Sequence, residues 1–189
     1  MIAILIAGLA LFLGVHLVPA VPGARRGLVA RWGEPRYKAI FSLVAAAGLV
    51  TLVAGYALGT PGPRLFASPP AARAGAPWLV VAAFILLAAS HLRGHMRQRL
   101  QHPMVIGVIL WAGVHLLANG DLRGTLLFAS FLVWAVLDLV ASLRRGPAPA
   151  FQPTWRHDAM AIVGGAVLAL GVMTIHRTLF GVAAASFSM

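Results

Sequence analysis

The apolar run IAILIAGLALFLGVHLVP, residues 2–19, decides the fold class of this protein. It contains no charged side chain and is about as long as a helix that crosses the hydrocarbon core of a bilayer. Five further apolar runs follow, and together they predict six membrane-spanning helices: residues 2–19, 39–58, 76–92, 103–118, 124–143 and 159–175. The runs are continuous rather than alternating, which favours helices over the strands of a membrane barrel. We expect an all-α, polytopic membrane bundle that forms a single transmembrane domain over residues 1–189.

The composition agrees with this prediction and excludes several other classes of protein. Hydrophobic residues make up 60% of the chain and charged residues 10%, with a mean hydropathy of +0.89, which leaves too little polar surface for a soluble domain. The net charge of +11 is divided among short clusters between the apolar runs, so we expect a lipid bilayer as partner and no nucleic acid. Cysteine is absent, which excludes disulfides, iron–sulfur clusters and covalently attached c-type haem.

The lysine and arginine residues predict the direction of the spans. Eleven of the 15 follow the first, third and fifth spans, and four follow the second, fourth and sixth. Because basic loops remain on the cytoplasmic side, we expect both termini on the periplasmic side of a bacterial inner membrane. No basic segment precedes the first run, so we interpret this run as a span and not as a cleaved signal peptide.

Two histidines lie inside apolar runs in closely matching surroundings. Residues 8–18 read GLALFLGVHLV and residues 107–117 read GVILWAGVHLL, with six of eleven aligned positions identical. The match favours two inverted three-helix halves. Within each segment a glycine, an aromatic residue and the histidine recur every four residues and therefore share one helix face: Gly8, Phe12 and His16 in the first, and Gly107, Trp111 and His115 in the second.

These two faces predict a haem b site. A glycine admits a flat group close to the backbone, the aromatic ring provides a stacking wall, and the imidazole is an iron ligand. We expect His16 and His115 to face each other and to coordinate one iron beside Phe12, Trp111 and Gly107. The alternative is that each histidine hydrogen-bonds a neighbouring carbonyl or hydroxyl and holds the bundle together.

The segment HLRGHMRQRLQHPM, residues 91–104, carries three more histidines between the third and fourth spans. His91 and His95 have the four-residue spacing that binds a metal on a helix, and His102 completes a candidate second metal site. No carboxylate lies nearby in the sequence. We therefore favour the other interpretation, a basic interfacial helix that contacts anionic headgroups or haem propionates.

Two features of the second and fifth spans are first of all structural. A stripe of small residues in the second span predicts close helix packing: Ala47, Thr51, Gly55 and Gly59. Near the end of the fifth span, Asp138 is followed by two arginines. We expect an ion pair between this carboxylate and a cytoplasmic-side arginine, and a proton relay is the alternative.

Four longer segments resemble the bacterial NnrU family and, more distantly, the plant ζ-carotene isomerase: HLVPAVPG (16–23), ARWGEPRYKAIFSLVAAAGL (30–49), QHPMVIGVILWAGVHLLANGDL (101–122) and LVWAVLDLVASLRR (132–145). The isomerase is a membrane haem b protein, and one of its two axial histidines lies thirteen residues after a His-Pro histidine. His102 and His115 have the same spacing. The resemblance implies haem b held by His16 and His115, with His102 and Asp138 as catalytic residues and Arg36 and Tyr37 in support.

The resemblance implies two kinds of chemistry. In the isomerase one ligand leaves the reduced iron, which then assists rotation about a cis double bond, so we expect a carotenoid or another apolar substrate and an unidentified redox partner. The NnrU name refers instead to nitrite and nitric-oxide metabolism.

Two alternatives are a haem-free scaffold or assembly factor for denitrification enzymes, and an S-adenosylmethionine-dependent membrane methyltransferase. Such methyltransferases have an Arg-His-Pro block followed by a glutamate pair near the last span. In this chain Gln101 precedes His102, and no glutamate follows Glu34.

Overall fold

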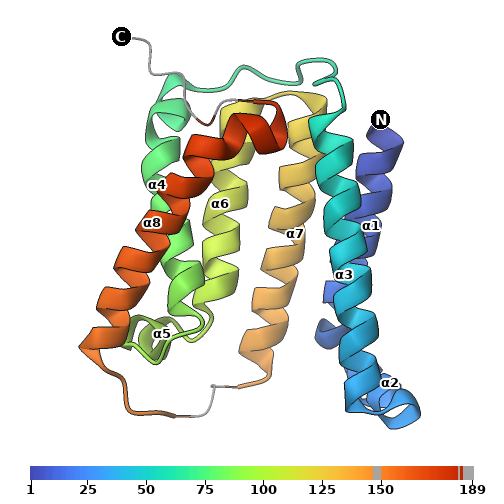
Figure 1. The fold of residues 1–189 in the computed structure, drawn as a ribbon, viewed down its shortest axis with the longest axis vertical. Helices are drawn as coiled ribbons and strands as arrows, with labels where there is room; N and C mark the ends of the chain where they lie inside the picture. The colour runs from blue at the N-terminus through green and yellow to red at the C-terminus, as the bar shows by residue number, and fades with distance from the viewer. Residues whose placement is uncertain (147–149, 183, 185–189) are drawn as a thin grey trace. The chain divides into compact units, whose positions relative to one another are not determined.

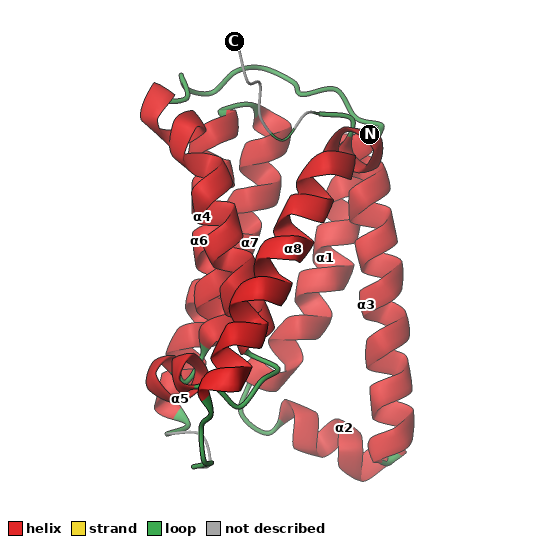
Figure 2. Cartoon of the chain, turned by 60° about the vertical axis from the view of Figure 1, so that its left-hand side comes forward, coloured by secondary structure: helices red, strands yellow, loops and turns green. Residues whose placement is uncertain are grey.

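The computed structural model describes residues 1–146, 150–182 and 184. These residues form helices and no strand (Figures 1 and 2), which confirms the all-α prediction. A helix forms at each predicted span: α1 (Ile2–Leu17), α3 (Glu34–Ala57), α4 (Pro70–Ala89), α6 (Pro103–Asn119), α7 (Leu122–Arg144) and α8 (Trp155–Phe180). Shorter helical segments lie between them: η1 (Val18–Ala20), α2 (Ala24–Trp32) and α5 (His95–Leu100).

Five helices in the described part of the chain are long and apolar enough to cross a membrane, namely α1 with η1, α3, α4, α7 and α8. The chain is therefore a multi-pass membrane protein. Helix α6 is apolar but has 17 residues. At 1.5 Å per residue it extends about 26 Å, slightly less than the roughly 30 Å of a hydrocarbon core. A sixth crossing by α6 stays a prediction.

The chain forms two compact units, Met1–Gly62 (unit 1) and Pro63–Met189 (unit 2). Unit 1 contains α1 to α3, and unit 2 contains α4 to α8. Two predicted spans thus fall in unit 1 and four in unit 2, so the units do not coincide with the predicted three-helix halves. The inverted repeat and the single domain over residues 1–189 remain predictions.

In unit 1, helices α1 and α3 lie side by side, and glycines allow their close approach (Figure 2). A Cβ atom at Gly48 would lie 2.6 Å from the backbone nitrogen of Phe12, and one at Gly55 would lie 2.5 Å from that of Leu5. A Cβ at Gly8 would collide with Leu52 of α3. Small residues thus bring the two helices into backbone contact.

The predicted small-residue stripe on α3 is confirmed at one position and wrong at others. Gly55 lies at the contact with α1. Ala47 is exposed, and Thr51 donates a hydrogen bond to the carbonyl of Ala47 on its own helix, at 2.8 Å. The contact face runs instead through Gly48 and Leu52, because the helical period of 3.6 residues turns the face one position away from a strict four-residue repeat.

In unit 2, helix α4 packs against both α6 and α8, and α7 packs against α6 (Figure 1). Two glycines make the closest contacts with α4. A Cβ atom at Gly165 of α8 would lie 2.5 Å from the Cα of Ile85, and one at Gly107 of α6 would lie 2.9 Å from the carbonyl oxygen of Ala83. Among the described residues of unit 2, five alanines are fully buried: Ala83, Ala112, Ala135, Ala161 and Ala169. Small side chains therefore allow close helix packing in the core of unit 2.

The turn between α6 and α7 is tied to the segment that precedes α4. Gly120 ends α6 with φ at +74°, and its carbonyl accepts hydrogen bonds from the backbone of Leu65 at 2.8 Å and Phe66 at 3.3 Å. Asp121 then caps α7 by accepting a hydrogen bond from the backbone N–H of Gly124 at 2.9 Å. These bonds fix the end of α6, one turn beyond His115.

Candidate functional site

His16 is the second-last residue of α1, and aromatic rings of unit 1 surround its imidazole. Its Nδ1 donates a hydrogen bond to the carbonyl of Phe12, one turn earlier, at 2.6 Å. Because a carbonyl only accepts hydrogen bonds, Nδ1 carries the proton and the ring lone pair is on Nε2. The ring centroids of Phe12 and Phe41 lie 4.4 and 5.1 Å from that of His16. This hydrogen bond thus orients the imidazole and leaves Nε2 as the nitrogen that could bind a metal.

His115 on α6 has the same arrangement in unit 2. Its Nδ1 donates to the carbonyl of Trp111 at 2.8 Å, which again leaves the lone pair on Nε2. The ring centroids of Trp111 and of Phe128 from α7 lie 5.2 and 4.8 Å from that of His115. Phe128 is inclined by 32° to the imidazole and so forms a wall beside it. The shared faces predicted for Phe12 with His16 and for Trp111 with His115 are confirmed by these ring contacts.

The glycines of the two matched segments have a different role from the one expected. Gly8 contacts Leu52 of α3, and Gly107 contacts the carbonyl of Ala83 of α4. Neighbouring helices therefore make the close approach that these glycines permit, and a contact of Gly107 with a cofactor stays a prediction. His16 belongs to unit 1 and His115 to unit 2, so their convergence on one iron is likewise untested.

The histidines of residues 91–104 do not form the second metal site that the spacing suggested. Helix α5 begins at His95, so His91 precedes this helix and the two do not share a helical face. No group of three or more potential metal ligands occurs among the described residues. Chelation on one helical face, the less favoured interpretation, is wrong because the loop after α4 continues to Gly94. The short helix carries Arg97 and Arg99, which agrees with the favoured interpretation of a basic helix.

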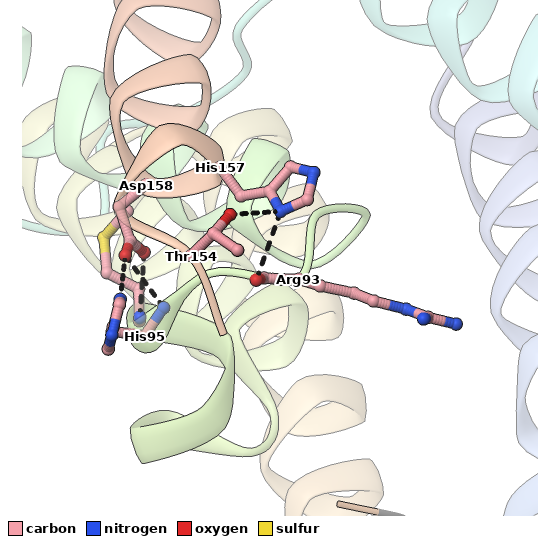
Figure 3. A network of polar contacts seen from close by, with 6 residues as sticks. Arg93, His95, Thr154, His157 and Asp158 are labelled. Carbon is pink, nitrogen blue, oxygen red and sulfur yellow. Dashed lines mark hydrogen bonds and ion pairs between the residues drawn. The ribbon is translucent and has the colours of Figure 1, made fainter. Parts of the chain in front are cut away.

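A buried carboxylate contacts this loop from the far end of the sequence (Figure 3). Asp158 lies in the first turn of α8 and is 5% exposed. Its carboxylate accepts hydrogen bonds from the backbone N–H and from the Nδ1 of His95, both at 2.8 Å, and from the backbone N–H of Met96 at 3.0 Å. A Cβ atom at Gly94 would collide with this carboxylate. Asp158 thus caps α5, although 63 residues separate it from His95.

A second set of contacts joins the same two segments. The backbone N–H of Thr154 donates to the carbonyl of Arg93 at 3.1 Å. His157 Nδ1 lies 2.8 Å from the hydroxyl of Thr154 and 3.3 Å from the same carbonyl (Figure 3). The ring of His95 also stacks on Trp155, with centroids 3.9 Å apart and planes inclined by 21°. We name this set the α5–α8 clasp: Arg93, His95, Met96, Thr154, Trp155, His157 and Asp158.

The α5–α8 clasp was not found by sequence reasoning, which looked for a carboxylate close to the histidines. One signal was available. Asp158 directly precedes the predicted sixth span, at a position where an acidic group favours the first turn of a helix. Chemically, the clasp directs Nδ1 of His95 toward the carboxylate of Asp158 and so fixes the orientation of the imidazole. It holds a basic loop against the start of α8.

His102 is the N-cap residue of α6, and Pro103 is the first residue of that helix, a position that proline favours. The preceding Gln101 has φ at +60°, a conformation that side chains other than glycine rarely adopt. The Nε2 atom of His102 is buried and has no hydrogen-bond partner among the described residues. An unsatisfied buried nitrogen is uncommon, and this one lies beside a strained residue.

The comparisons with known proteins give one match. The family model described as NnrU protein matches residues 4–184, which is nearly the whole chain. The chain belongs to the NnrU family. No curated protein matches this chain. No solved structure matches it either.

Two further residues that the resemblance implied for this NnrU protein now have structural partners. A carboxylate oxygen of Asp138 lies 4.0 Å from a guanidinium nitrogen of Arg145, and the side chain of Asp138 is mostly buried. The predicted ion pair between Asp138 and one of the arginines that follow it is therefore confirmed. Tyr37 is buried at the start of α3 and lies next to Phe41, which contacts His16. The guanidinium of Arg25 lies 5.4 Å from the Tyr37 ring. Tyr37 is thus connected to His16 through one aromatic ring.

Proposed function

We propose that this NnrU protein is a membrane haem b protein and that His16 and His115 would hold its iron. The observation that carries this proposal is the shared hydrogen bond from Nδ1 to the carbonyl four residues earlier. Metal-binding histidines in proteins usually donate their second ring N–H to a carbonyl or carboxylate, which fixes the tautomer and the orientation of the ring. Two histidines far apart in the sequence meet this requirement in the same way.

The donor chemistry of the chain fits haem b. Bis-imidazole ligation requires two neutral histidines in apolar surroundings, and both imidazoles lie among aromatic rings. Thiolate ligation is excluded because the chain has no cysteine. The described residues also contain no cluster of three ligands for a different metal site, so these single histidines are the best candidates.

Each residue near the two histidines has a role in this proposal. The backbone carbonyls of Phe12 and Trp111 accept hydrogen bonds from the Nδ1–H groups and limit the rotation of the imidazoles. Phe128 and Phe41 exclude water from the two rings. When bound, haem would supply an iron that changes between the ferric and ferrous states. His102, with its buried Nε2, is the candidate for moving a proton during the reaction, and Asp138 is the candidate for supporting it.

The proposed chemistry is redox-controlled cis–trans isomerisation of a carotenoid or another apolar substrate, or a redox reaction related to nitrogen oxides. A membrane location supports an apolar substrate, since such molecules partition into the bilayer. Either reaction requires an electron from a redox partner. The resemblance to the isomerase supports the first reaction and the family name the second.

Absorbance spectroscopy of the purified protein tests this proposal. We expect non-covalent haem b with a low-spin, bis-imidazole spectrum when the protein is produced with haem supplied. His115→Ala should lose most of the bound haem or become high-spin, whereas the control His91→Ala, at an exposed loop residue, should match the wild type. A wild-type preparation without a Soret band would overturn the proposal and favour a haem-free scaffold or assembly factor.

We also propose a location in the bacterial inner membrane with both termini on the periplasmic side. The support is the excess of basic residues in the loops after α1, α4 and α7. Reporter fusions after Arg26 and after Arg64 should report the cytoplasm and the periplasm, respectively. The same side for both fusions would contradict the proposed order of crossings.

A further inference from the structure

Four arginines surround the α5–α8 clasp without an acidic partner: Arg93, Arg97, Arg99 and Arg156. In the part of the chain that the structure describes, no ion pair joins any of them to a carboxylate. Asp158 lies within the clasp, but its carboxylate is buried and accepts three hydrogen bonds there. It therefore leaves the charge of the arginines uncompensated at the surface.

Contacts between α5 and the start of α8 hold these arginines at one end of unit 2 (Figure 1). The carbonyl of Arg93 accepts a hydrogen bond from the backbone N–H of Thr154 at 3.1 Å, two residues before Arg156. The guanidinium of Arg97 lies 5.6 Å from the ring centre of Phe151, in the segment that leads into α8. The side chain of Arg93 extends away from the clasp (Figure 3). Two segments far apart in the sequence thus place their basic side chains at the same end of unit 2.

This end of unit 2 lies where two membrane-crossing helices end and begin. Helix α4 ends at Ala89, shortly before the basic loop, and the crossing by α8 begins at Trp155, which is 70% exposed. Tryptophan is enriched at the boundary between hydrocarbon and headgroups. Because Arg93, Arg99 and Arg156 are also exposed, their guanidinium groups are available at the depth of the lipid headgroups.

We propose that this surface binds the phosphate of an anionic phospholipid, and we name it the headgroup surface: Arg93, Arg97, Arg99, Trp155 and Arg156. Guanidinium groups form paired, charge-assisted hydrogen bonds with phosphate oxygens, and several basic side chains together attract an anionic lipid. The indole of Trp155 stacks on His95 with centroids 3.9 Å apart, which fixes an apolar ring beside the charges. Adjacent cations and an exposed apolar ring suit a lipid better than a soluble anion. This binding does not depend on haem.

Native mass spectrometry of the full chain in detergent measures this binding. The wild type is titrated with phosphatidylglycerol and, separately, with phosphatidylcholine, whose headgroup has no net charge. We expect it to bind phosphatidylglycerol at least about fivefold more tightly, with an affinity that falls as salt is added. A triple variant with Arg93→Gln, Arg99→Gln and Arg156→Gln should lose about tenfold of this affinity and most of the preference.

A matched control variant removes the same charge from unit 1. It changes three exposed arginines of α2 and α3 to glutamine: Arg26, Arg31 and Arg36. In this region Glu34 pairs with Arg25 and Lys38, so an acidic side chain already offsets part of the basic charge. We expect the control to change the affinity for phosphatidylglycerol by less than about twofold.

Three results would overturn the inference. Equal losses in the two triple variants would show that binding follows net charge and not the headgroup surface. Equal affinity of the wild type for the two lipids would show that the surface does not select an anionic headgroup. Displacement of phosphatidylglycerol by inorganic phosphate or by polyglutamate would assign the surface to a soluble anion or to an acidic protein. Arg99→Gln alone is the second variant if the triple variant does not fold, and it should weaken binding by about threefold.

Discussion

Units 1 and 2 are stabilised by different kinds of contact. In unit 1, α1 and α3 meet through glycines, and the ion pairs of Glu34 with Arg25 and Lys38 are exposed at the start of α3. In unit 2, glycine contacts are combined with a buried carboxylate, Asp158, that three donors satisfy. Both units bury small residues, but among the described residues the buried carboxylate that accepts several hydrogen bonds lies in unit 2.

The difference follows from what each unit must position. Lipid gives little hydrophobic drive for two helices to associate, so α1 and α3 depend on close van der Waals packing. Unit 2 must also hold a polar loop of arginines and histidines at the end of four helices. Packing alone does not orient such a loop, whereas a carboxylate that accepts directional hydrogen bonds does. Unit 2 therefore depends on specific hydrogen-bond partners, whereas unit 1 depends mainly on small residues that let two helix backbones approach each other.

Removal of the buried carboxylate should have the largest effect on stability. We expect Asp158→Ala to destabilise unit 2 by about 3 kcal/mol, because the donors of His95 and Met96 lose their acceptor in a buried place. Thermal unfolding in detergent should show this loss as a lower apparent midpoint. Gly94→Ala should act in the same direction, since its methyl group would displace the carboxylate. Unchanged midpoints for both variants would show that the α5–α8 clasp does not stabilise the fold.

Glycine-to-alanine substitutions at the helix contacts should have the next largest effect on stability, in both units. Gly48→Ala in unit 1 and Gly165→Ala in unit 2 should each cost about 2 kcal/mol, because the added carbon meets backbone atoms. The matched controls are Gly14→Ala and Gly164→Ala, where the added methyl group has no atom within 4 Å. We expect these controls to be neutral or slightly stabilising. Equal midpoints for a contact variant and its control would contradict the backbone contact in that unit.

His102→Ala should lower the stability less than the Asp158 and glycine variants do. This contrasts with the large effect expected for Asp158→Ala in the same unit. The buried Nε2 of His102 has no hydrogen-bond partner among the described residues, so its removal leaves no other group unsatisfied. We expect the stability to stay within about 1 kcal/mol of the wild type and the bound haem to be retained, with a lower catalytic rate. Complete haem loss in this variant would instead identify His102 as a ligand.

The exposed ion pairs of unit 1 should contribute least to stability. Glu34→Gln removes the charge that Arg25 and Lys38 contact at 2.6 and 3.3 Å. Because all three side chains are exposed, the loss should be less than about 1 kcal/mol and should shrink further as salt is added. Unfolding midpoints at low and high ionic strength check this. A loss as large as that of Asp158→Ala would remove the distinction between the two units.

Much of the histidine chemistry was predictable from local sequence. The bond from Nδ1 to the carbonyl four residues earlier lies within one helix, and so does the shared face of His115 with Trp111. A helical period therefore suffices to predict them. The cap at His102 was predictable for the same reason, because Pro103 favours the first position of a helix. Contacts of this kind need no knowledge of which helices are neighbours.

The sequence by itself determined the all-helical membrane class, the positions of the apolar helices and the local pairing of each histidine with its aromatic residue. Only the tertiary structure decided that Asp158 caps α5 and that Gly107 faces α4. The physical reason is that apolar periodicity predicts which face of a helix is apolar, but not which neighbouring helix packs against that face. A carboxylate 63 residues from its histidine becomes a partner only when packing brings the two chain segments together.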